Sequence, residues 1–282
     1  MIKMQEKILE RKLLEMVEED LGFYDITTAF TPSRRVEAEI IAKDPGIVSG
    51  IYELHTLFNL FNIKSKSRLR DGERIKRNQR IFSLKGNSRD ILIVERIALN
   101  ILSRMSGISS LTRKFINRVE KINPKIRIAA TRKTSPLFSY FEKKAVKVAG
   151  GDTHRLSMGD EVLIKDNHLK LFGGVERALR IAKKETSFSH KIEIEVNEVK
   201  DAILAARNGA DIIMLDNMSI REIKKVVSEL EKMGLRENVI LEVSGGINLE
   251  NISDYAKTNV DVISIGALTH SAPALDFSLE IL

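Results

Sequence analysis

Neither cysteine nor tryptophan occurs among the 282 residues of this chain. The absence of cysteine excludes disulfides, thiol catalysis, cysteine-ligated zinc and iron–sulfur clusters. No apolar run approaches the length of about 18 residues that a membrane-spanning helix needs. The N-terminus mixes charges of both signs with apolar residues, unlike a secretory signal. We therefore expect a cytoplasmic protein with no segment in a membrane.

Positive charge is in excess, with 46 Lys and Arg against 39 Asp and Glu, a net charge of +7 and a pI of about 9.4. This balance favours an anionic partner, which could be nucleic acid, a lipid surface or small anions. The basic stretch over residues 64–80 is the main argument for a nucleic-acid-binding protein. However, aromatic residues make up only 5% of the chain, and none lies in that stretch to stack on bases. We expect no nucleic-acid partner and keep that class as the alternative.

Residues 36–86 are predicted to form short strands separated by turns. The segments EAEIIAK, IVSG and RIFSLKG are rich in β-branched residues, and Asp44-Pro45-Gly46 and Asp71-Gly72 are turn formers. Apolar residues at three- and four-residue spacing predict a helix over residues 88–104. Residues 1–105 therefore indicate an N-terminal α+β domain, on which residues 271–282 could pack back.

A different pattern begins near residue 126. Short apolar runs alternate with helical segments, and the runs lack the clean alternation of half-exposed strands, which predicts parallel strands buried on both faces. The helices are clearest at 199–207 and 220–232. A complete eightfold barrel takes roughly 250 residues, so residues 106–270 predict an open, incomplete (β/α) barrel of six or seven parallel strands. The runs are IRIAA, EVLI, KIEIEV, DIIML, NVILEV and VDVISI.

Polar or glycine-rich residues lie near the end of each of these runs or directly after it. The carboxyl ends of the strands of a barrel meet at one face, where barrel enzymes have their active sites, so these residues are candidates for a single site. The alternative at each position is an ordinary turn or helix cap, because chains surface at strand ends. The groups are Thr131-Arg132-Lys133, Lys165-Asp166-Asn167-His168, Glu195, Asp216-Asn217, Ser244-Gly245-Gly246, and Gly266 with His270.

Four cations would surround the mouth of such a site. A cationic cluster repels itself unless an anionic ligand compensates, and guanidinium groups hold carboxylates or phosphates by paired hydrogen bonds. The sequence therefore predicts a pocket for small anions, with a solvated turn as the alternative for the first two residues. The four cations are Arg132, Lys133, Arg155 and Lys165.

Glu195 and Asp216 end two strands that are consecutive in the chain. Their oxygens could bind Mg²⁺ beside ligand phosphates, or stabilise a developing cation. Salt bridges to neighbouring Lys and Arg are the alternative. The glycine-containing turns at 244–246 and 264–267 would let backbone N–H groups approach a phosphate closely.

Three of the five histidines, His154, His168 and His270, fall in this region. Their spacing matches no metal-ligand motif, so we interpret them as hydrogen-bonding residues rather than zinc ligands. The sequence also lacks a GxGxxG fingerprint, a Walker A loop and a GxSxG elbow. These absences argue against a dinucleotide dehydrogenase, a P-loop ATPase and an α/β-hydrolase.

A series of ordered blocks runs through nearly the whole chain. They are Glu19-Asp20-Leu21-Gly22, Asp25-Ile26-Thr27, Glu95-Arg96-Ile97-Ala98-Leu99-Asn100, Ser106-Gly107, Thr131-Arg132-Lys133-Thr134, residues 150–156 (GGDTHRL), residues 164–168 (IKDNH), Glu193-Ile194-Glu195-Val196, Met214-Leu215-Asp216-Asn217, Ser244-Gly245-Gly246-Ile247 and Gly266-Ala267-Leu268-Thr269-His270. Together these blocks resemble the quinolinate phosphoribosyltransferase family, whose members are also called nicotinate-nucleotide pyrophosphorylase (carboxylating).

The resemblance implies an enzyme that converts quinolinate and 5-phosphoribosyl-1-pyrophosphate, with Mg²⁺ as cofactor, into nicotinate mononucleotide, pyrophosphate and CO₂ in NAD biosynthesis. It also implies two domains, an N-terminal α/β sandwich joined to an open, incomplete barrel. The chain would form a homodimer, or a higher even oligomer, with active sites completed by the partner subunit. Carried over to this chain, catalysis would rest on Lys133, Lys165, Glu195 and Asp216. Quinolinate would be bound by Arg132, Lys133, His154, Arg155 and Lys165, with Arg96 from the neighbouring chain. Glu195 and Asp216 would face the ribose and metal, and Ser244, Gly245, Gly246, Gly266 and His270 would bind phosphates.

The chain departs from the family pattern in one region. A Pro-Gly-Leu-Arg-like turn is usual after Thr134, whereas this chain has Ser135-Pro136-Leu137-Phe138-Ser139, and Lys144 stands at a position that is usually Tyr. These changes flank the expected substrate region and bear on substrate affinity and choice. The same-fold alternative is therefore a related phosphoribosyltransferase acting on another aromatic acid, as in a paralogous branch associated with molybdenum transport. The block at 165–168 and Thr134 favour the quinolinate enzyme.

Overall fold

The computed structural model describes residues 3–282, which form two compact units. Unit 1 takes in the chain up to Arg113, then Ser135–Gly150 and Ser271–Leu282, and unit 2 takes in Lys114–Thr134 and Gly151–His270. This division differs from the expected ranges, 1–105 and 106–270, in two ways. Unit 1 extends further along the chain than residue 105, and residues 135–150 belong to unit 1 rather than to the barrel.

Unit 1 contains a four-stranded antiparallel sheet in the order β12-β1-β5-β3. In β1 (Arg35–Ala42) buried side chains alternate with more exposed ones, so only one face of this strand is covered. It pairs with β5 (Arg80–Asn87) on one side and with β12 (Phe277–Ile281) on the other. Strand β3 (Lys64–Lys66) completes the sheet, and β2 (Gly46–Ile47) and β4 (Arg74–Ile75) form a separate pair.

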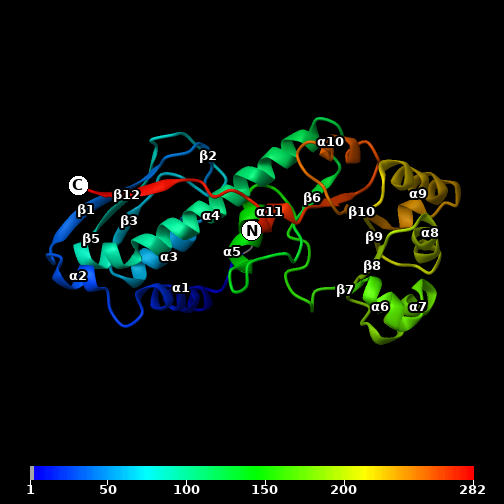
Figure 1. The fold of residues 1–282 in the computed structure, drawn as a ribbon, viewed down its shortest axis with the longest axis horizontal. Coiled ribbons are helices and arrows are strands. Elements are labelled where there is room, and N and C mark those ends of the chain that lie inside the picture. Colours follow the sequence, from blue (N-terminus) through cyan, green and yellow to red (C-terminus); the bar gives the residue numbers. More distant parts are fainter. Residues whose placement is uncertain (1–2) are drawn as a thin grey trace. The chain divides into compact units, whose positions relative to one another are not determined.

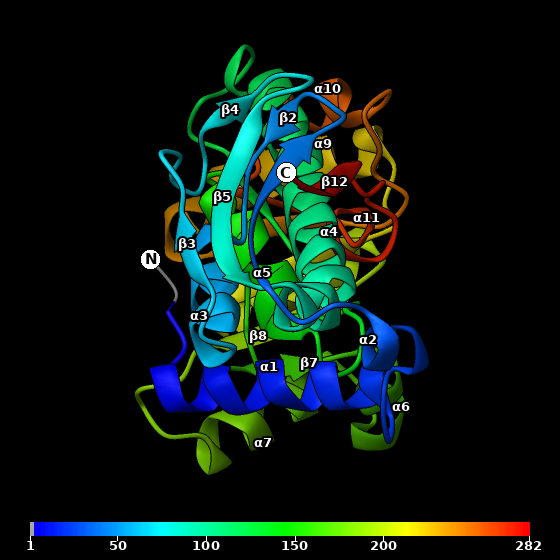
Figure 2. The ribbon, with the colours of Figure 1, turned by 90° about the vertical axis from the view of Figure 1, so that its left-hand side faces the viewer.

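The helices of unit 1 lie beside these strands in Figure 2. Helix α1 buries Leu9, Leu13 and Val17, which are spaced four residues apart, and it contacts α3. The helices of this unit are α1 (Glu6–Leu21), α2 (Ile26–Phe30), α3 (Ile51–Leu60), α5 (Ser139–Val148) and the greater part of α4 (Ser88–Glu120).

Helix α4 is much longer than the helix predicted over residues 88–104, since it runs for 33 residues. Its buried side chains continue beyond that point with Met105, Ile108 and Phe115. Gly107 lies in the middle of this helix, where an added Cβ would come within 2.1 Å of the backbone oxygen of Pro273. The glycine is therefore required by the close passage of the segment that leads to β12.

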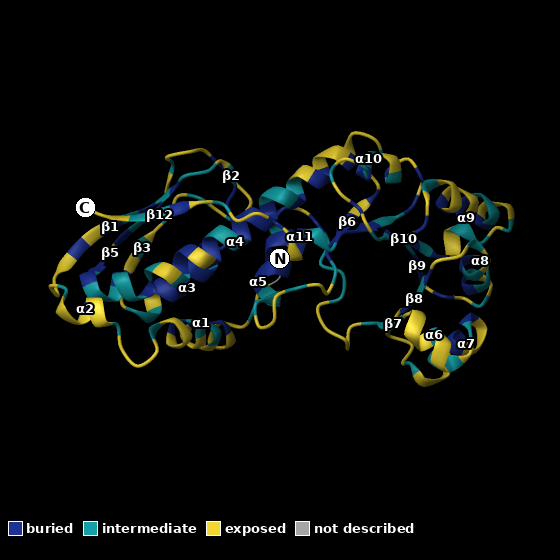
Figure 3. Ribbon diagram, viewed as in Figure 1, coloured by how far each residue is buried: buried dark blue, intermediate teal, exposed yellow. Residues whose placement is uncertain are grey.

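Unit 2 is a six-stranded parallel sheet in the order β6-β11-β10-β9-β8-β7, with helices outside it (Figure 1). The strands at the two ends of this order do not pair with each other, so the sheet is open. Figure 3 shows both buried and exposed residues on most of these helices, although none of residues 166–172 is buried. The α/β fold predicted from the sequence is confirmed, with six barrel strands. They are β6 (Arg127–Ala129), β7 (Val162–Ile164), β8 (Ile192–Val196), β9 (Ile212–Asp216), β10 (Ile240–Ser244) and β11 (Val262–Ser264).

Two helices of unit 2, α8 (Val199–Arg207) and α9 (Ile220–Lys232), have the bounds that the spacing of apolar residues predicted. The Ser219 hydroxyl accepts a hydrogen bond from the Glu222 N–H and so caps α9. Between residues 3 and 282, no helix combines the length and apolar character needed to cross a bilayer. The remaining helices of the unit are α6 (Asp166–Phe172), α7 (Val175–Glu185), α10 (Ile252–Tyr255), α11 (Ala267–His270) and the 3-10 turn η1 (Arg236–Asn238).

Candidate active site

A cavity of about 490 Å³ opens at the carboxyl ends of the strands of unit 2. It lies where the parallel sheet predicted it, and most of the residues singled out in the sequence line it. The predicted residues in the lining are Arg132, Lys133, His154, Arg155, Lys165, Glu195, Asp216, Ser244, Gly245 and Gly246.

Three of the residues to which the family resemblance gives a role lie outside this lining, and so do the candidates Asp166, Asn167 and His168 after β7. Gly266 and His270 are close to Lys133, because a Cβ added at Gly266 would come within 3.1 Å of His270 Nε2 and 3.0 Å of Lys133 Cδ. The Thr269 hydroxyl also donates a hydrogen bond of 2.7 Å to the Lys133 carbonyl, which ties α11 to the loop after β6. Arg96 is exposed on α4, in the part of the chain that belongs to unit 1.

Lys165 and Glu195 form an ion pair within the pocket. The Lys165 Nζ lies 2.6 Å from Glu195 Oε2, and the two side chains are 45% and 15% exposed. Lys165 follows β7 and Glu195 lies near the end of β8, so the pairing of neighbouring strands brings them together. The salt-bridge alternative for Glu195 is therefore realised in this structure, although both groups still face the cavity.

The turn after β9 is shaped around Asp216 and Asn217. Asn217 donates from Nδ2 to Asp216 Oδ2 at 2.7 Å and from its backbone N–H to the Ser244 carbonyl at 2.9 Å. Gly245 has φ +97°, and a Cβ there would lie 2.2 Å from Asn217 Oδ1. Only glycine fits this close approach. The turn at 244–246, which was predicted to bind a phosphate, therefore also keeps Asp216 and Asn217 in place.

Glu195 and Asp216 lie on adjacent strands, β8 and β9, and both line the cavity. Carboxylate oxygens are the ligands that Mg²⁺ prefers, and this ion usually keeps several waters and binds substrate phosphates as well. The carboxylates of Glu195 and Asp216 therefore fit Mg²⁺ that arrives with a phosphorylated substrate. Glu195 would then give up its ion pair with Lys165 to bind the ion.

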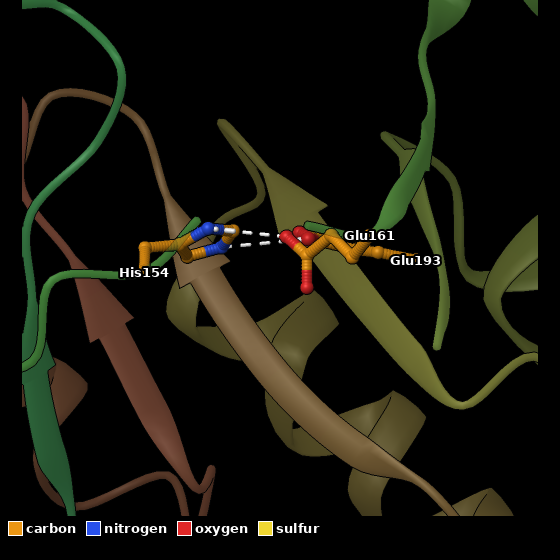
Figure 4. Close-up of side chains that lie close together, drawn as sticks. All are labelled: His154, Glu161 and Glu193. Carbon is orange, nitrogen blue, oxygen red and sulfur yellow. Dashed lines mark ion pairs between the residues drawn. The ribbon is translucent and has the colours of Figure 1, made fainter. Parts of the chain in front are cut away.

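His154 is held among three glutamates that the sequence analysis did not assign to the site (Figure 4 shows two of them). Its Nε2 lies 3.4 Å from Glu193 Oε2 and 3.2 Å from Glu242 Oε2, and its Nδ1 lies 3.2 Å from Glu161 Oε1. Glu193 and Glu242 are buried, with exposed fractions of 0% and 2%. We call these four residues the His–Glu cluster.

The environment of the His–Glu cluster changes the pKa of two of its members. Burial alone would lower the pKa of His154, but the carboxylates of Glu193 and Glu242 outweigh it and raise the pKa to about 10. Burial raises the pKa of Glu161 to about 7, and the nearby Glu193 carboxylate adds to this effect. Nδ1 of a protonated ring can donate to Glu161, whereas Nδ1 of a neutral ring accepts the Arg155 N–H at 2.8 Å.

A signal for two of these glutamates was present in the sequence. Glu193 and Glu242 lie inside the apolar runs KIEIEV and NVILEV, which become β8 and β10. A charged residue within a strand that is buried on both faces must find a partner inside the fold. Glu161 begins the run EVLI and gave no comparable signal.

The residues that depart from the family pattern all lie in unit 1 and none lines the cavity among the described residues. Leu137 is exposed with φ +62°, and Phe138 stacks on Phe141 with ring centroids 4.6 Å apart. Ser139 begins α5. Lys144 is buried and pairs with Glu53, so its role is in the interior of unit 1 rather than at the pocket.

An open parallel sheet with a cationic pocket at its carboxyl edge defines a barrel-type enzyme for anionic substrates. Residues 25–106 match the description "Quinolinate phosphoribosyl transferase, N-terminal domain", and residues 108–280 match the C-terminal domain of the same name. The chain belongs to the quinolinate phosphoribosyltransferase family, which confirms the resemblance found in the sequence.

Relatives from distant organisms agree with this assignment. A protein of Archaeoglobus fulgidus named "Probable nicotinate-nucleotide pyrophosphorylase [carboxylating]" is 49% identical over 262 residues, which cover 93% of this chain and 100% of that protein. The human nicotinate-nucleotide pyrophosphorylase [carboxylating] is 36% identical over 245 residues, covering 87% of this chain and 82% of the human protein. The solved structure of the Francisella tularensis nicotinate-nucleotide pyrophosphorylase has a TM-score of 0.91 and 35% identity, covering 99% of this chain and 98% of that one.

Proposed function

We propose that this chain transfers the phosphoribosyl group of 5-phosphoribosyl-1-pyrophosphate to quinolinate, with loss of CO₂, to give nicotinate mononucleotide in de novo NAD biosynthesis. The observation that carries this proposal is the cavity of unit 2, where Arg132, Lys133, Arg155 and Lys165 face the carboxylates of Glu195 and Asp216. Both substrates are strongly anionic, which suits the cations, while the carboxylates suit a reaction that develops positive charge.

The cations would bind and orient quinolinate. Arg132 and Arg155 can each hold a carboxylate by two parallel hydrogen bonds. Lys165 would exchange its contact with Glu195 for a substrate carboxylate. That exchange would leave the Glu195 carboxylate available to the ribose, so binding of the acid would prepare the site for the second substrate.

The carboxylates would stabilise the transfer step. The bond from ribose C1 to pyrophosphate breaks, and its electron pair leaves with pyrophosphate, while the lone pair of the quinolinate nitrogen forms the new bond to C1. Positive charge grows on the ribose carbon as this happens, and Glu195 and Asp216 can stabilise it. The ring nitrogen becomes cationic and stabilises the carbanion that is left when CO₂ departs from the adjacent carbon, and this carbanion then takes a proton. Positioning and electrostatics suffice for these steps.

Phosphates would be bound at the turns of residues 244–246 and at Gly266 with His270, where backbone N–H groups can approach closely. Glu195 and Asp216 would hold Mg²⁺ together with the substrate. The ion would neutralise negative charge on the leaving pyrophosphate.

We further propose that the active form is a cytoplasmic homodimer or higher even oligomer, in which Arg96 reaches the site of the neighbouring chain. Several large apolar side chains at the start of the chain are exposed, namely Phe23, Tyr24, Ile26 and Phe30. Large exposed apolar side chains that lie close together in the sequence support a protein–protein interface in this segment. The absence of cysteine agrees with the reducing cytoplasm but does not require it.

The proposal is tested with purified protein, quinolinate, 5-phosphoribosyl-1-pyrophosphate and Mg²⁺ in an assay that follows both CO₂ and nicotinate mononucleotide. We expect both products in equal amounts. Parallel reactions replace quinolinate by nicotinate or another aromatic acid. Turnover of such an acid by folded protein, without turnover of quinolinate, would refute the substrate assignment and favour the same-fold alternative.

A further inference from the structure

A second cavity lies in unit 1 and shares no residue with the proposed active site. It lies beside strand β3, which contacts both helix α3 and strand β5 (Figure 2). Its volume is about 750 Å³, and ligand sites in proteins commonly have volumes of roughly 300–1,000 Å³. The cavity is therefore large enough for a small molecule, and the proposed transfer reaction does not use it.

Positive charge dominates the lining of this cavity. Its basic side chains are those of Lys66, Arg68 and Arg80, and none of the described residues that line it is acidic. A concave surface that carries charge of one sign focuses the electric field and attracts ions of the opposite sign. The lining therefore favours an anionic ligand.

Two of these cations have no counterion within the protein. No carboxylate oxygen of the described residues lies within 4.0 Å of the charged nitrogens of Lys66 or Arg68. Lys85, on the neighbouring strand β5, differs because its Nζ lies 2.6 Å from Glu37 Oε1. The charge of Lys85 is thus compensated by the fold, whereas the charges of Lys66 and Arg68 are left for a ligand to compensate.

The backbone that carries these cations is held in place. Lys66 lies opposite Ser83 in the antiparallel pairing of β3 with β5. The Ser67 hydroxyl accepts the Leu69 N–H at 3.1 Å, which fixes the turn that contains Arg68. Since the backbone is positioned before a ligand arrives, less conformational freedom is lost on binding.

Neutral polar groups complete the cavity. Ser65, Ser67 and Ser83 line it and are partly buried. His55 also lines it, with Nδ1 2.7 Å from Ser65 Oγ and its ring packed edge-on against Phe82 at a centroid distance of 5.0 Å. Basic side chains together with hydroxyl groups are the side chains that usually bind phosphate oxygens.

We propose that this cavity binds a small molecule through a diphosphate group, with Lys66, Arg68 and Arg80 as the cations that hold it. Arg80 pairs with Glu39 through Nη1, and its guanidinium has further N–H donors for the ligand. Two linked phosphates carry enough charge to compensate three cations, which a single phosphate does less well. The lining contains no Phe, Tyr or Trp on which a base could stack, so the ligand is a small anion rather than a single-stranded nucleic acid.

The test measures hydrogen exchange of the full chain, by mass spectrometry, as inorganic pyrophosphate is added. Peptides that cover residues 64–69 and 79–83 report on this cavity, and a peptide that covers residues 244–246 reports on the proposed active site. We expect pyrophosphate to slow exchange in the first two peptides, and inorganic phosphate to do so only at higher concentration. Equal effects of the two anions would refute the diphosphate assignment.

Two double variants that lose the same charge locate the site. Lys66→Ala with Arg68→Ala should raise the pyrophosphate concentration that gives half of the protection by at least about tenfold. Lys43→Ala with Lys85→Ala should leave it unchanged, because neither residue lines the cavity. If the first variant does not fold, Lys66→Gln with Arg68→Gln serves in its place.

Three results would overturn the proposal. The first is the absence of protection over residues 64–69, and the second is protection that the Lys66 and Arg68 variant keeps in full. The third is a single-stranded oligonucleotide that protects the same peptides at lower concentration than pyrophosphate, which would assign the cavity to nucleic acid. None of these measurements depends on quinolinate turnover, so failure of this proposal is distinct from failure of the proposed function.

Discussion

Lys165 and Glu195, two residues predicted for the active site, form an ion pair with each other inside the cavity. The residue types and their positions after strands could be predicted, because parallel strands bring their carboxyl ends together. Their partners could not be predicted in the same way. The contact of His154 with Glu193 and Glu242 depends on which residues face the interior of the sheet, which periodicity does not show for strands buried on both faces.

Removal of a pocket cation should weaken the use of quinolinate. Lys165→Ala or Arg132→Ala removes a charge that would pair with a substrate carboxylate, and loss of such a pair costs about 2–5 kcal/mol. We expect kcat/KM for quinolinate to fall by at least about thirtyfold in steady-state kinetics. Lys170→Ala is the control, because this lysine is exposed on α6 and does not line the cavity. Near-normal kinetics in both pocket variants would contradict the proposed role of the cations.

Lys144 should matter for stability rather than for catalysis. Its Nζ lies 2.7 Å from Glu53 Oε1 and 3.2 Å from Asp71 Oδ2, and its side chain is only 2% exposed. Lys144→Met leaves the Glu53 carboxylate buried without its cation, which should lower the free energy of unfolding by about 3–5 kcal/mol. Denaturant unfolding measures this loss, and the kinetic constants of the folded variant should stay near normal.

The double variant Glu53→Gln with Lys144→Met separates charge from packing. It removes both charges of the pair, so it should recover part of the lost stability. A double variant no more stable than Lys144→Met would show that the ion pair is not the cause of the loss.

Helix α5 shows why the division of the chain could not be predicted. It follows a barrel strand, β6, after a short loop, as a helix of a βα unit would. Its neighbours are instead on α4: Arg104 donates to Glu142 at 2.9 Å, and the Ser109 hydroxyl donates to the Ala145 carbonyl at 2.7 Å. These contacts join residues far apart in sequence, and the apolar pattern of a helix does not identify the surface that it covers.

Replacement of Gly107 by alanine should destabilise the protein, whereas the same replacement usually stabilises a helix. An exposed helix gains about 0.5–1 kcal/mol when glycine is replaced by alanine. In α4 the new Cβ would meet the Pro273 carbonyl oxygen, a backbone atom that cannot move alone. Gly107→Ala should therefore lower the midpoint of urea unfolding and reduce hydrogen-exchange protection of β12. Asn117→Ala, at an exposed position of the same helix, should be neutral or slightly stabilising, and equal behaviour of the two variants would contradict the steric argument.

In the proposed oligomer, each active site contains residues from two chains. In the proposed oligomer Arg96 of one chain serves a site that contains Asp216 of another, although this structure places the two residues in different units of one chain. Arg96→Ala and Asp216→Ala homodimers should each have little activity. Heterodimers formed by mixing them contain one site with neither substitution, so up to half of the normal activity per site should return in the product assay. Confirmed heterodimers without recovered activity would refute the shared site.

Strand β12 follows every strand of unit 2 in the chain, yet it pairs with β1 near the beginning. During synthesis a ribosome therefore releases all six barrel strands before β12, the second partner of β1 besides β5, emerges. Unit 2 can complete its sheet at that time, while β1 still presents a row of unpaired backbone groups that could pair with another nascent chain. The order of the strands thus makes the late arrival of a short C-terminal segment the step at which this protein is most exposed to aggregation.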